Sequence, residues 1–466
     1  MQDFNWLSIN YLQIFNMKPK KDPQQNNQHD LFRSELVNMI NPNHALVKLS
    51  KVVDWRRLEE VFGETYCPDN GRPAISTRLM VALHYLKYSY DLSDDDVVQG
   101  WLENPYWQYL SGMKFFQHEI PIHPSSMTRW RNRIGETGGE EILKETIGAG
   151  LRMKAIKKSQ LKRINVDTTV QEKDIRFPTD ARLYDRARQR LVDTAKMHGI
   201  ELRQNYNRVA RKLVCQQSRY AHARQMKRAR RAVKKLKTYL GCVYRDIQRK
   251  LEETPLLKPH FSESLLLAER VLSQERYDKK KLYSFHAPEV ECIAKGKAHK
   301  KYEFGVKVGV AVTNKDNFVV GMKALPDNPY DGHTLGEMLS QVMRLTGKTL
   351  ERCYVDKGYR GHKMKEPFVI MPGRKRGVTS TIRKELKRRN AIEPIIGHMK
   401  EDGKLNRNYL KGTFGDKINA ILCGSGHNIR IILRKLRELK DFFLFYFQLL
   451  VVIAKRSSNL RLATVA

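Results

Sequence analysis

The sequence predicts a mixed α/β sheet flanked by helices, with an all-helical N-terminal domain and a basic helical insertion. Three observations lead to this prediction. Residues 30–152 show helical periodicity, β-branched segments alternate with helical ones over residues 284–405, and a long arginine-rich stretch follows the first predicted strand. With 466 residues, the chain is long enough for two or three domains with substantial cores.

The charge balance is strongly basic, with 86 Lys and Arg against 50 Asp and Glu and a formal net charge of +36. The hydrophobic content of 41% is that of a folded chain. A large cationic excess favours polyanions, because binding releases the counterions condensed on them. The composition therefore indicates a nucleic-acid-binding protein, and a ribosome-bound or membrane-surface protein is the alternative.

The cysteines and the terminal segments indicate a cytoplasmic protein. The six cysteines include no C-x-x-C pair and no zinc-like spacing, so we expect reduced structural thiols. Residues 1–30 are polar and contain no signal core, and we expect a loose lead-in there. The apolar run Phe442–Ala454 is 13 residues long, whereas a membrane-spanning helix needs about 20. We expect that run to be a buried or partner-facing helix, and we expect no membrane partner.

Residues 1–152 are predicted to form a helical DNA-binding domain. Ser76 and Thr77 can cap an amphipathic helix, since their side chains can accept hydrogen bonds from its first turn. Ser93 opens a further helix, because the three aspartates after it complement the dipole of a first helical turn.

A short basic helix is predicted at Met127–Ile134, after a proline and two serines that favour a helix start. Helix-turn-helix proteins place helices of this kind against DNA, so Arg129 and Arg131 are candidate DNA contacts. The alternative is an ordinary surface helix with a buried Trp130. The sequence leaves both interpretations open.

The first strand is predicted at Leu161–Val170, where apolar and polar residues alternate and Asp167 projects opposite the apolar ones. After the insertion we expect two strands, a helix, two further strands and a helical stretch. Their predicted bounds are 302–313, 318–325, 332–345, 352–356, 367–371 and 380–400.

The insertion is predicted at residues 176–283. Within it, residues 182–250 carry 21 Lys and Arg against four Asp and Glu, and so supply +17 of the net charge. The absence of proline from this stretch predicts long helices. We expect Lys234, Lys235 and Lys237 to contact DNA, and a solvated helical hairpin is the alternative.

Three acidic residues occur in surroundings that suit one site. Asp167 lies on the first strand, Asp356 follows a later strand at a glycine turn, and Glu393 lies in a helical stretch. Phosphodiester cleavage with divalent metal uses two hard cations held by oxygen ligands. Carboxylates at neighbouring strand ends and on a facing helix can supply such ligands. Pro394 disfavours helical geometry for Glu393, so the helix can restart there with Glu393 near its cap.

With these residues the chain resembles bacterial insertion-sequence transposases of the D-D-E class, in the insertion-sequence four/five group with a tyrosine-arginine-glutamate-lysine signature. The resemblance covers most of residues 30–435 and includes the order and spacing of the motifs. The segments that carry it are Asn165–Thr169, His286–Val290, Asn328–Thr334, Tyr354–Gly361, and Arg389–Glu393 with Lys400.

The resemblance implies a ribonuclease-H-like fold in which Asp167, Asp356 and Glu393 are catalytic and bind two Mg²⁺ ions, with Mn²⁺ able to substitute. Arg389 and Lys400 match the basic positions of the signature and would contact phosphates near the transposon end.

Two further positions follow from the resemblance. Leu386 occupies the position of the signature tyrosine, so that tyrosine contact is not expected here. Tyr359 would support the site and its contact with DNA.

The implied activity is that of a DNA transposase. Such an enzyme binds terminal inverted repeats, cleaves the transposon ends and joins the freed 3′ ends to target DNA. Its partners would be double-stranded DNA and a second copy of the chain in the synaptic complex, in the nucleoid-associated cytoplasm of a prokaryote. A structure-selective nuclease of the same fold and a catalytically inactive DNA-binding regulator are the alternatives.

The predicted domain division follows from these assignments. It comprises an N-terminal DNA-binding domain at 1–152, a catalytic core at 160–175 and 284–405, the insertion at 176–283, and a C-terminal helical segment at 406–466.

Overall fold

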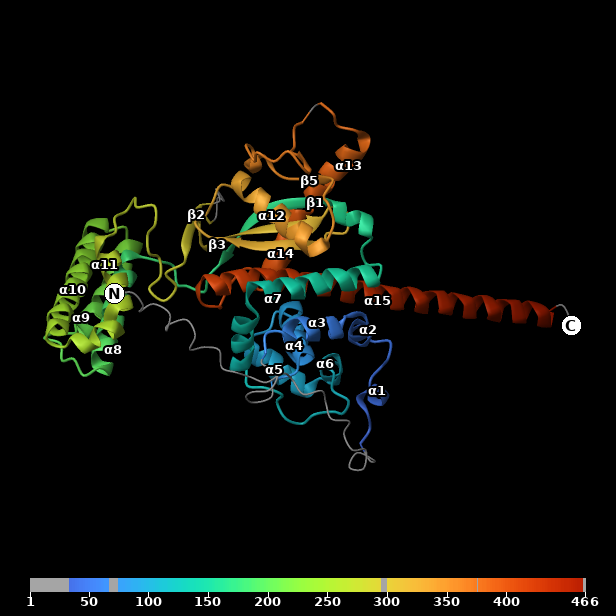
Figure 1. Ribbon diagram of the computed structural model, residues 1–466, viewed down its shortest axis with the longest axis horizontal. Coiled ribbons are helices and arrows are strands. Elements are labelled where there is room, and N and C mark those ends of the chain that lie inside the picture. Colours follow the sequence, from blue (N-terminus) through green and yellow to red (C-terminus); the bar gives the residue numbers. More distant parts are fainter. Residues whose placement is uncertain (1–32, 67–73, 295–299, 375, 464–466) are drawn as a thin grey trace, which may run out of the picture.

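The computed structural model describes residues 33–66, 74–294, 300–374 and 376–463, with side chains described up to residue 438. A mixed sheet lies on one side of the molecule and the N-terminal helices on the other, and the helical insertion stands at one end (Figure 1). The long helices α7 (Ser125–Arg152) and α15 (Gly412–Ala463) run between the sheet and the N-terminal helices. The lead-in predicted for residues 1–30 lies outside the described residues.

The N-terminal region is helical, as predicted. Its remaining helices are α1 (Leu36–Met39), α2 (Ala45–Val52), α3 (Trp55–Gly63), α4 (Thr77–Ser89), α5 (Asp94–Glu103) and α6 (Pro105–Leu110). Ser93 forms a reciprocal capping box with Asp96 at the start of α5. Ser76 precedes α4, as expected, but its side chain makes no capping hydrogen bond. The predicted basic helix is the first part of α7, which Gly135 interrupts with a φ of 66°.

The sheet is mixed. Its strands are β1 (Arg163–Glu172), β2 (Glu291–Ala294), β3 (Tyr302–Thr313), β4 (Val319–Leu325), β5 (Arg352–Tyr354) and β6 (Phe368–Ile370). β1 is central, with β3 antiparallel on one side and β5 parallel on the other. β4 and β2 both pair antiparallel with β3, and β6 pairs parallel with β5. Five of these strands were predicted to within a few residues, whereas the short β2 was not.

The remaining helices flank the sheet or form the insertion. The insertion contains α8 (Asp180–Met197), α9 (Asn207–His222), α10 (Met226–Glu253) and α11 (Lys258–Ser273), and the other helices are α12 (Asp331–Thr346), α13 (Ser380–Arg389) and α14 (Ile392–Asp402). Short 3₁₀ turns are η2 (Lys158–Lys162), η3 (Pro255–Leu257) and η4 (Lys357–Tyr359). The long helices of the insertion were predicted, although α11 was not. No helix of the described residues is long and apolar enough to cross a membrane.

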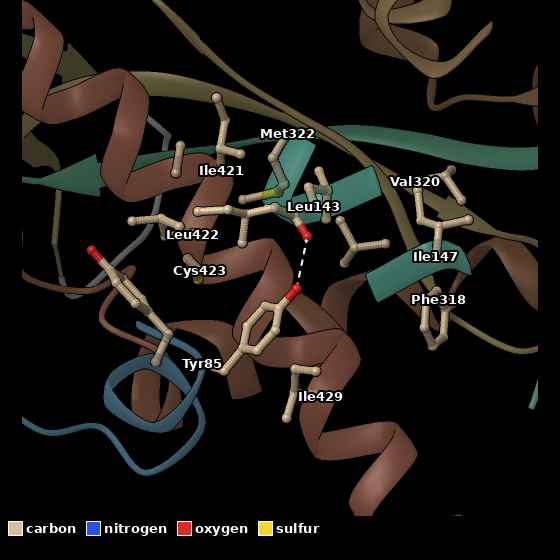
Figure 2. Close-up of a cluster of buried hydrophobic side chains, with 14 of the residues drawn as sticks. Tyr85, Leu143, Ile147, Phe318, Val320, Met322, Ile421, Leu422, Cys423 and Ile429 are labelled. Atoms are coloured by element: carbon tan, nitrogen blue, oxygen red, sulfur yellow. Dashed lines mark hydrogen bonds between the residues drawn. The ribbon is translucent and has the colours of Figure 1, made fainter. Parts of the chain in front are cut away.

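The hydrophobic core of the sheet continues into the N-terminal helices. Figure 2 shows Tyr85 of α4, Leu143 of α7, Met322 of β4 and Ile421 of α15 in one cluster. The Tyr85 hydroxyl donates to the carbonyl of Ile142 at 3.2 Å, so its polar atom is satisfied inside this core. The insertion has a second, separate core between α8, α10 and α11. The sheet therefore rests on the N-terminal helices, whereas the insertion is stabilised by its own packing.

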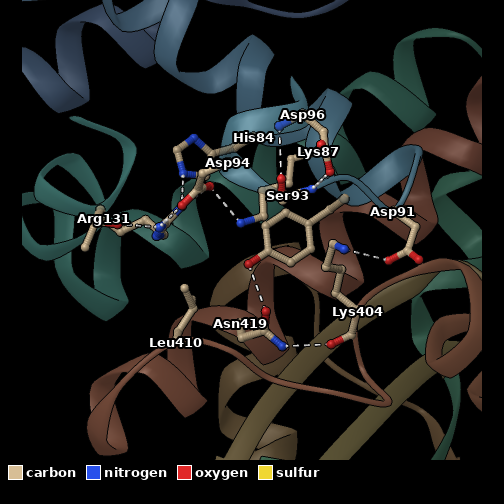
Figure 3. A network of polar contacts seen from close by, with 12 residues as sticks. His84, Lys87, Asp91, Ser93, Asp94, Asp96, Arg131, Lys404, Leu410 and Asn419 are labelled. Carbon is tan, nitrogen blue, oxygen red and sulfur yellow. Dashed lines mark hydrogen bonds and ion pairs between the residues drawn. The ribbon is translucent and has the colours of Figure 1, made fainter. Parts of the chain in front are cut away.

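A buried polar network fastens α7 to α4 and α5 (Figure 3). Arg131 is 2% exposed and donates to both carboxylate oxygens of Asp94, at 3.0 and 2.6 Å. Lys87 also donates to Asp94, at 2.7 Å, and Trp130 is buried nearby. The structure thus gives Arg131 the role of a buried ion-pair partner instead of the predicted DNA contact, because a bidentate partner fixes its guanidinium inside the protein. Arg129 is exposed, as a DNA contact requires.

Candidate active site

The strand pairing brings Asp167 and Asp356 together. β5 pairs with β1 in parallel up to Asn165 and Tyr354, each aspartate follows its strand's last paired residue by two positions, and the charges of both act on Tyr359. Neighbouring strands lie about 4.8 Å apart, so the two carboxylates share one edge of the sheet. β5 ends at Tyr354 while β1 continues to Glu172, which opens the sheet at the carboxyl end of β5. Ligands of open α/β sheets bind at such an edge.

The Asp167 carboxylate accepts hydrogen bonds from the backbone of the next residue and from a side chain of α13. Its Oδ1 accepts from the backbone N–H of Thr168 at 2.8 Å, and its Oδ2 accepts from Arg389 Nη2 at 2.9 Å. The Asp167 side chain is 15% exposed and that of Arg389 9%. The charge of Asp167 is therefore stabilised where the sheet opens.

Asp356 follows β5 by two residues and caps the turn of η4. Its Oδ1 accepts from the backbone N–H of Gly358 at 2.9 Å, a local bond typical of aspartate at a turn. Tyr359, the last residue of η4, is fully buried, and its hydroxyl makes no hydrogen bond to the described residues. Burial first, and then the negative charges of Asp167, Asp331 and Asp356, raise the pKa of Tyr359 well above its ordinary value. The phenol therefore stays protonated, with an unused donor beside the carboxylates.

Glu393 lies in the first turn of α14, as its neighbour Pro394 led us to expect. The helix restarts at Ile392, after a break at residues 390–391, and not at Pro394 itself. Arg389 ends α13 and approaches Glu393 Oε1 at 3.7 Å with Nη1, while its Nη2 contacts Asp167. Arg389 thus bridges two of the three predicted acids. The Glu393 side chain is 70% exposed and faces solvent.

Glu385 holds α13 against the sheet. Its side chain is 5% exposed and accepts from Arg352 Nε at 2.9 Å and from the hydroxyl of Tyr354. Burial acts to raise the pKa of Glu385, but the hydrogen bonds from Arg352 and Tyr354 outweigh it and lower the pKa below the ordinary value. Asn314 joins the same contact by donating to the Glu385 carbonyl at 2.9 Å. These bonds fix the helix end that carries Arg389.

The other predicted site residues lie apart from the acids. Lys400 is on α14, the helix that carries Glu393. Its Nζ lies 3.9 Å from Glu303 Oε1, so its side chain is directed to β3 and not to β1, the strand of Asp167. Lys234, Lys235 and Lys237 are exposed on α10 of the insertion.

The structure adds Asp331, which the sequence analysis did not assign to the site. It opens α12, and its Oδ1 accepts from Thr168 Oγ1 and from Lys307 Nζ, each at 3.1 Å. Its Oδ2 is 3.5 Å from where a Cβ on Gly358 would lie, and Asp356 Oδ1 is 3.0 Å from the same point. Asp331 belongs to the resembling segment Asn328–Thr334, but its distance along the chain from Asp167 and Asp356 hid their proximity.

The donor set fits magnesium in its chemistry. All candidate ligands are carboxylate oxygens, and Mg²⁺ usually takes one or two of these with water and substrate phosphate. The unused Tyr359 hydroxyl is a buried polar group that a ligand or its water could satisfy. Within the described residues, however, no three His, Cys, Asp or Glu side chains converge closely enough to hold an ion by themselves. Arg389 supplies the positive charge at Asp167 in this structure.

Two comparisons with known proteins find relatives of this chain. Residues 34–133, which comprise α1–α6 and the start of α7, match the model described as "Transposase domain (DUF772)". The chain is also 54% identical, over 209 residues, to the uncharacterized protein ORF8 in the nfe locus of Rhizobium meliloti. That alignment covers 45% of this chain and the whole of the relative. No solved structure matches the chain. The chain therefore belongs to the same family as the ORF8 protein of the nfe locus, and its residues 34–133 are similar to a transposase domain.

Proposed function

We propose that the protein is a D-D-E transposase of the insertion-sequence four/five group, which cleaves transposon ends and joins them to target DNA. The observation that carries the proposal is the parallel pairing of β1 with β5, which precedes Asp356 by two residues, together with Arg389 bridging Asp167 and Glu393. The match to a transposase domain and the net charge of +36 support the same conclusion.

The strand arrangement supports a ribonuclease-H-like catalytic core. β1, β3 and β4 form an antiparallel meander, and β5 and β6 extend the sheet parallel to β1 on its other side. The insertion enters between β1 and β2, and it has a hydrophobic core of its own. The acids therefore stay next to one another although more than one hundred residues separate the first two along the chain.

Asp167, Asp356 and Glu393 would hold two Mg²⁺ ions, which supply a Lewis acid for both the attacking and the leaving oxygen. Arg389 neutralises Asp167 before loading and is free to turn to a DNA phosphate when Asp167 takes a cation. Tyr359 would donate its hydroxyl to a phosphate or water oxygen between the aspartates. Two ends must be held together for joining, so we propose a homodimer on DNA.

The proposed DNA-binding surface consists of exposed cationic side chains. Arg129 on α7 and Lys234, Lys235 and Lys237 on α10 are exposed, and Lys400 lies on the helix of Glu393. Duplex DNA binds such rows through its phosphates without reading sequence. Recognition of inverted repeats would come from base contacts of the N-terminal helices.

An in vitro reaction tests the proposal. The wild-type protein and Asp356→Ala are incubated with Mg²⁺ and a labelled duplex taken from the inverted repeats that flank the gene, together with plasmid target. We expect wild-type cleavage and strand transfer, and a loss of about 10³-fold or more in Asp356→Ala, the scale on which a charge-stabilising group acts.

The outcomes separate the three candidate functions. Cleavage without strand transfer favours the nuclease. Specific binding without cleavage, over a range of metal and salt, favours the regulator, for which the occupation of Asp167 by Arg389 is the supporting observation. Equal cleavage by wild type and Asp356→Ala contradicts the site assignment.

A further inference from the structure

The segment Asn328–Thr334 has no part in the D-D-E proposal, although it packs against the turn that carries Asp356. The Tyr330 hydroxyl donates to the Arg360 carbonyl at 3.1 Å. Gly332 lies so close that an added Cβ would approach the carbonyl oxygens of Arg360 and Tyr359 to 3.0 and 3.3 Å. The start of α12 and the Asp356 turn therefore form one closely packed unit, and a side chain at position 332 would crowd that contact.

Asp331 extends from this unit toward the acids with one oxygen fixed and one unused. Oδ1 accepts from Thr168 on β1 and from Lys307 on β3, which is buried. Among the described residues, Oδ2 takes part in no hydrogen bond, and it borders Gly358 beside the carboxylate of Asp356. A carboxylate that is oriented through one oxygen presents the other to a ligand in a defined direction.

Tyr359 gives an independent sign that a ligand belongs among these carboxylates. Its side chain is fully buried, its hydroxyl has no partner in the described residues, and the charges of Asp167, Asp331 and Asp356 all act on it. A buried hydroxyl without a partner costs roughly 1–3 kcal/mol, so its retention requires an explanation. A cation that brings water or phosphate oxygen into the space between the carboxylates would give the hydroxyl an acceptor.

We propose that Asp331 is a fourth carboxylate of the metal centre, which binds a divalent cation through Oδ2 next to Asp356, with Lys307 and Thr168 as the residues that orient it. This inference rests on the proposed function, since it adds a ligand to the same centre. It also accounts for the exposure of Glu393: with Asp331 present, the cation beside Asp356 has a second carboxylate before Glu393 turns inward. Lys307 then moderates the repulsion between the neighbouring carboxylates when no cation is bound.

Binding of Mn²⁺ alone to the full-length protein, measured by the electron paramagnetic resonance signal of free Mn²⁺ without DNA, tests the proposal. We expect Asp331→Asn to raise the Kd for Mn²⁺ by at least about tenfold, the lower end of the losses seen when metal-orienting groups are removed. The matched control is Asp327→Asn, because Asp327 lies four residues earlier, is ion-paired with Lys280 at 3.2 Å, and is outside the site. An unchanged Kd in the control and a raised one in Asp331→Asn support the proposal.

A second pair of variants keeps the test decisive. Asp331→Asn leaves Lys307 without its counter-ion, so the double variant Lys307→Met with Asp331→Asn serves if the single variant unfolds. Asp356→Asn serves as the reference for the centre as a whole. Wild-type Mn²⁺ affinity in an Asp331 variant, with affinity lost in Asp356→Asn, overturns the role of Asp331 and leaves the proposed centre standing. Wild-type affinity in Asp356→Asn overturns the centre itself.

Discussion

In the helical insertion the cations lie outside a small apolar core, whereas around the sheet several cations are buried against carboxylates. Residues 182–250 carry 21 Lys and Arg, and those of α10 such as Lys234 and Lys237 are exposed, with Arg188 beside Asp185 as a buried exception. In the other region Arg131, Lys173, Lys307 and Arg389 are each less than 10% exposed and each contacts an aspartate.

The difference shows that one charge excess serves two physical purposes. A buried ion pair fixes the position of its two side chains. Removing one member leaves the other charge buried alone, which costs far more free energy than the pair contributes. An exposed cation contributes little to stability and is free for a polyanion. We therefore expect substitutions in the sheet-bearing region to change folding or chemistry, and substitutions on the insertion to change DNA binding.

The largest effect is expected at Asp94. Asp94→Asn leaves both Arg131 and Lys87 buried without a counter-charge, which should lower the free energy of unfolding by about 3–5 kcal/mol. Tryptophan fluorescence in a denaturant titration measures it, since all five tryptophans lie within residues 1–130. Asp95→Asn is the matched control: Asp95 is exposed in the same helical turn and should cost less than about 1 kcal/mol. Equal losses in the two variants would show that the network is not what stabilises this region.

Each unit of pH is expected to have a smaller effect than the Asp94 substitution. Burial first, and then the charge of Arg131, lower the pKa of His84 to about 3, and burial with Arg430 does the same for His427. The unfolded chain binds these protons near pH 6.5, so stability should fall as the pH falls from about 6.5 toward 4, by up to about 1.4 kcal/mol per pH unit for each histidine.

The two regions should respond differently to acid. None of His198, His222, His260 and His286, in and beside the insertion, is buried. The free energy of unfolding measured by tryptophan fluorescence should therefore fall between pH 6.5 and 4. Over the same range, the circular dichroism signal of the insertion helices should persist. The slope measured by fluorescence should be smaller in His84→Gln. A slope that is the same in His84→Gln and in wild type would contradict the assignment to His84.

The smallest effect on stability is expected on the insertion. Reversing Lys234, Lys235 and Lys237 to glutamate should change stability by no more than roughly 0.5 kcal/mol per site. If these lysines contact phosphates, each lost contact lowers the slope of log K against log salt by about 0.9. The control reverses Lys154, Lys157 and Lys158, which are exposed outside the insertion. Equal salt slopes for the two triple variants would mean that α10 is a solvated face.

The local elements follow from patterns along the chain. The alternation at Leu161–Val170, the β-branched run at 302–313 and the proline after Glu393 predicted β1, β3 and the helix break, because such patterns reflect burial and backbone geometry within a few residues. The sequence also marked Asp167 and Asp356 through their strand settings. The short β2 and the helix α11 escaped because neither carries a strong periodic signal.

Which side chains meet depends on how distant segments pack. Arg131 on a basic helix proved to be buried against Asp94, Arg389 reached Asp167 across 222 positions, and Asp331 came to border the Asp356 turn. This packing also joined the N-terminal helices and the sheet in one core while leaving the insertion with its own. Strand register and helix packing are set by contacts between distant segments, and periodicity along the chain carries no information about those partners.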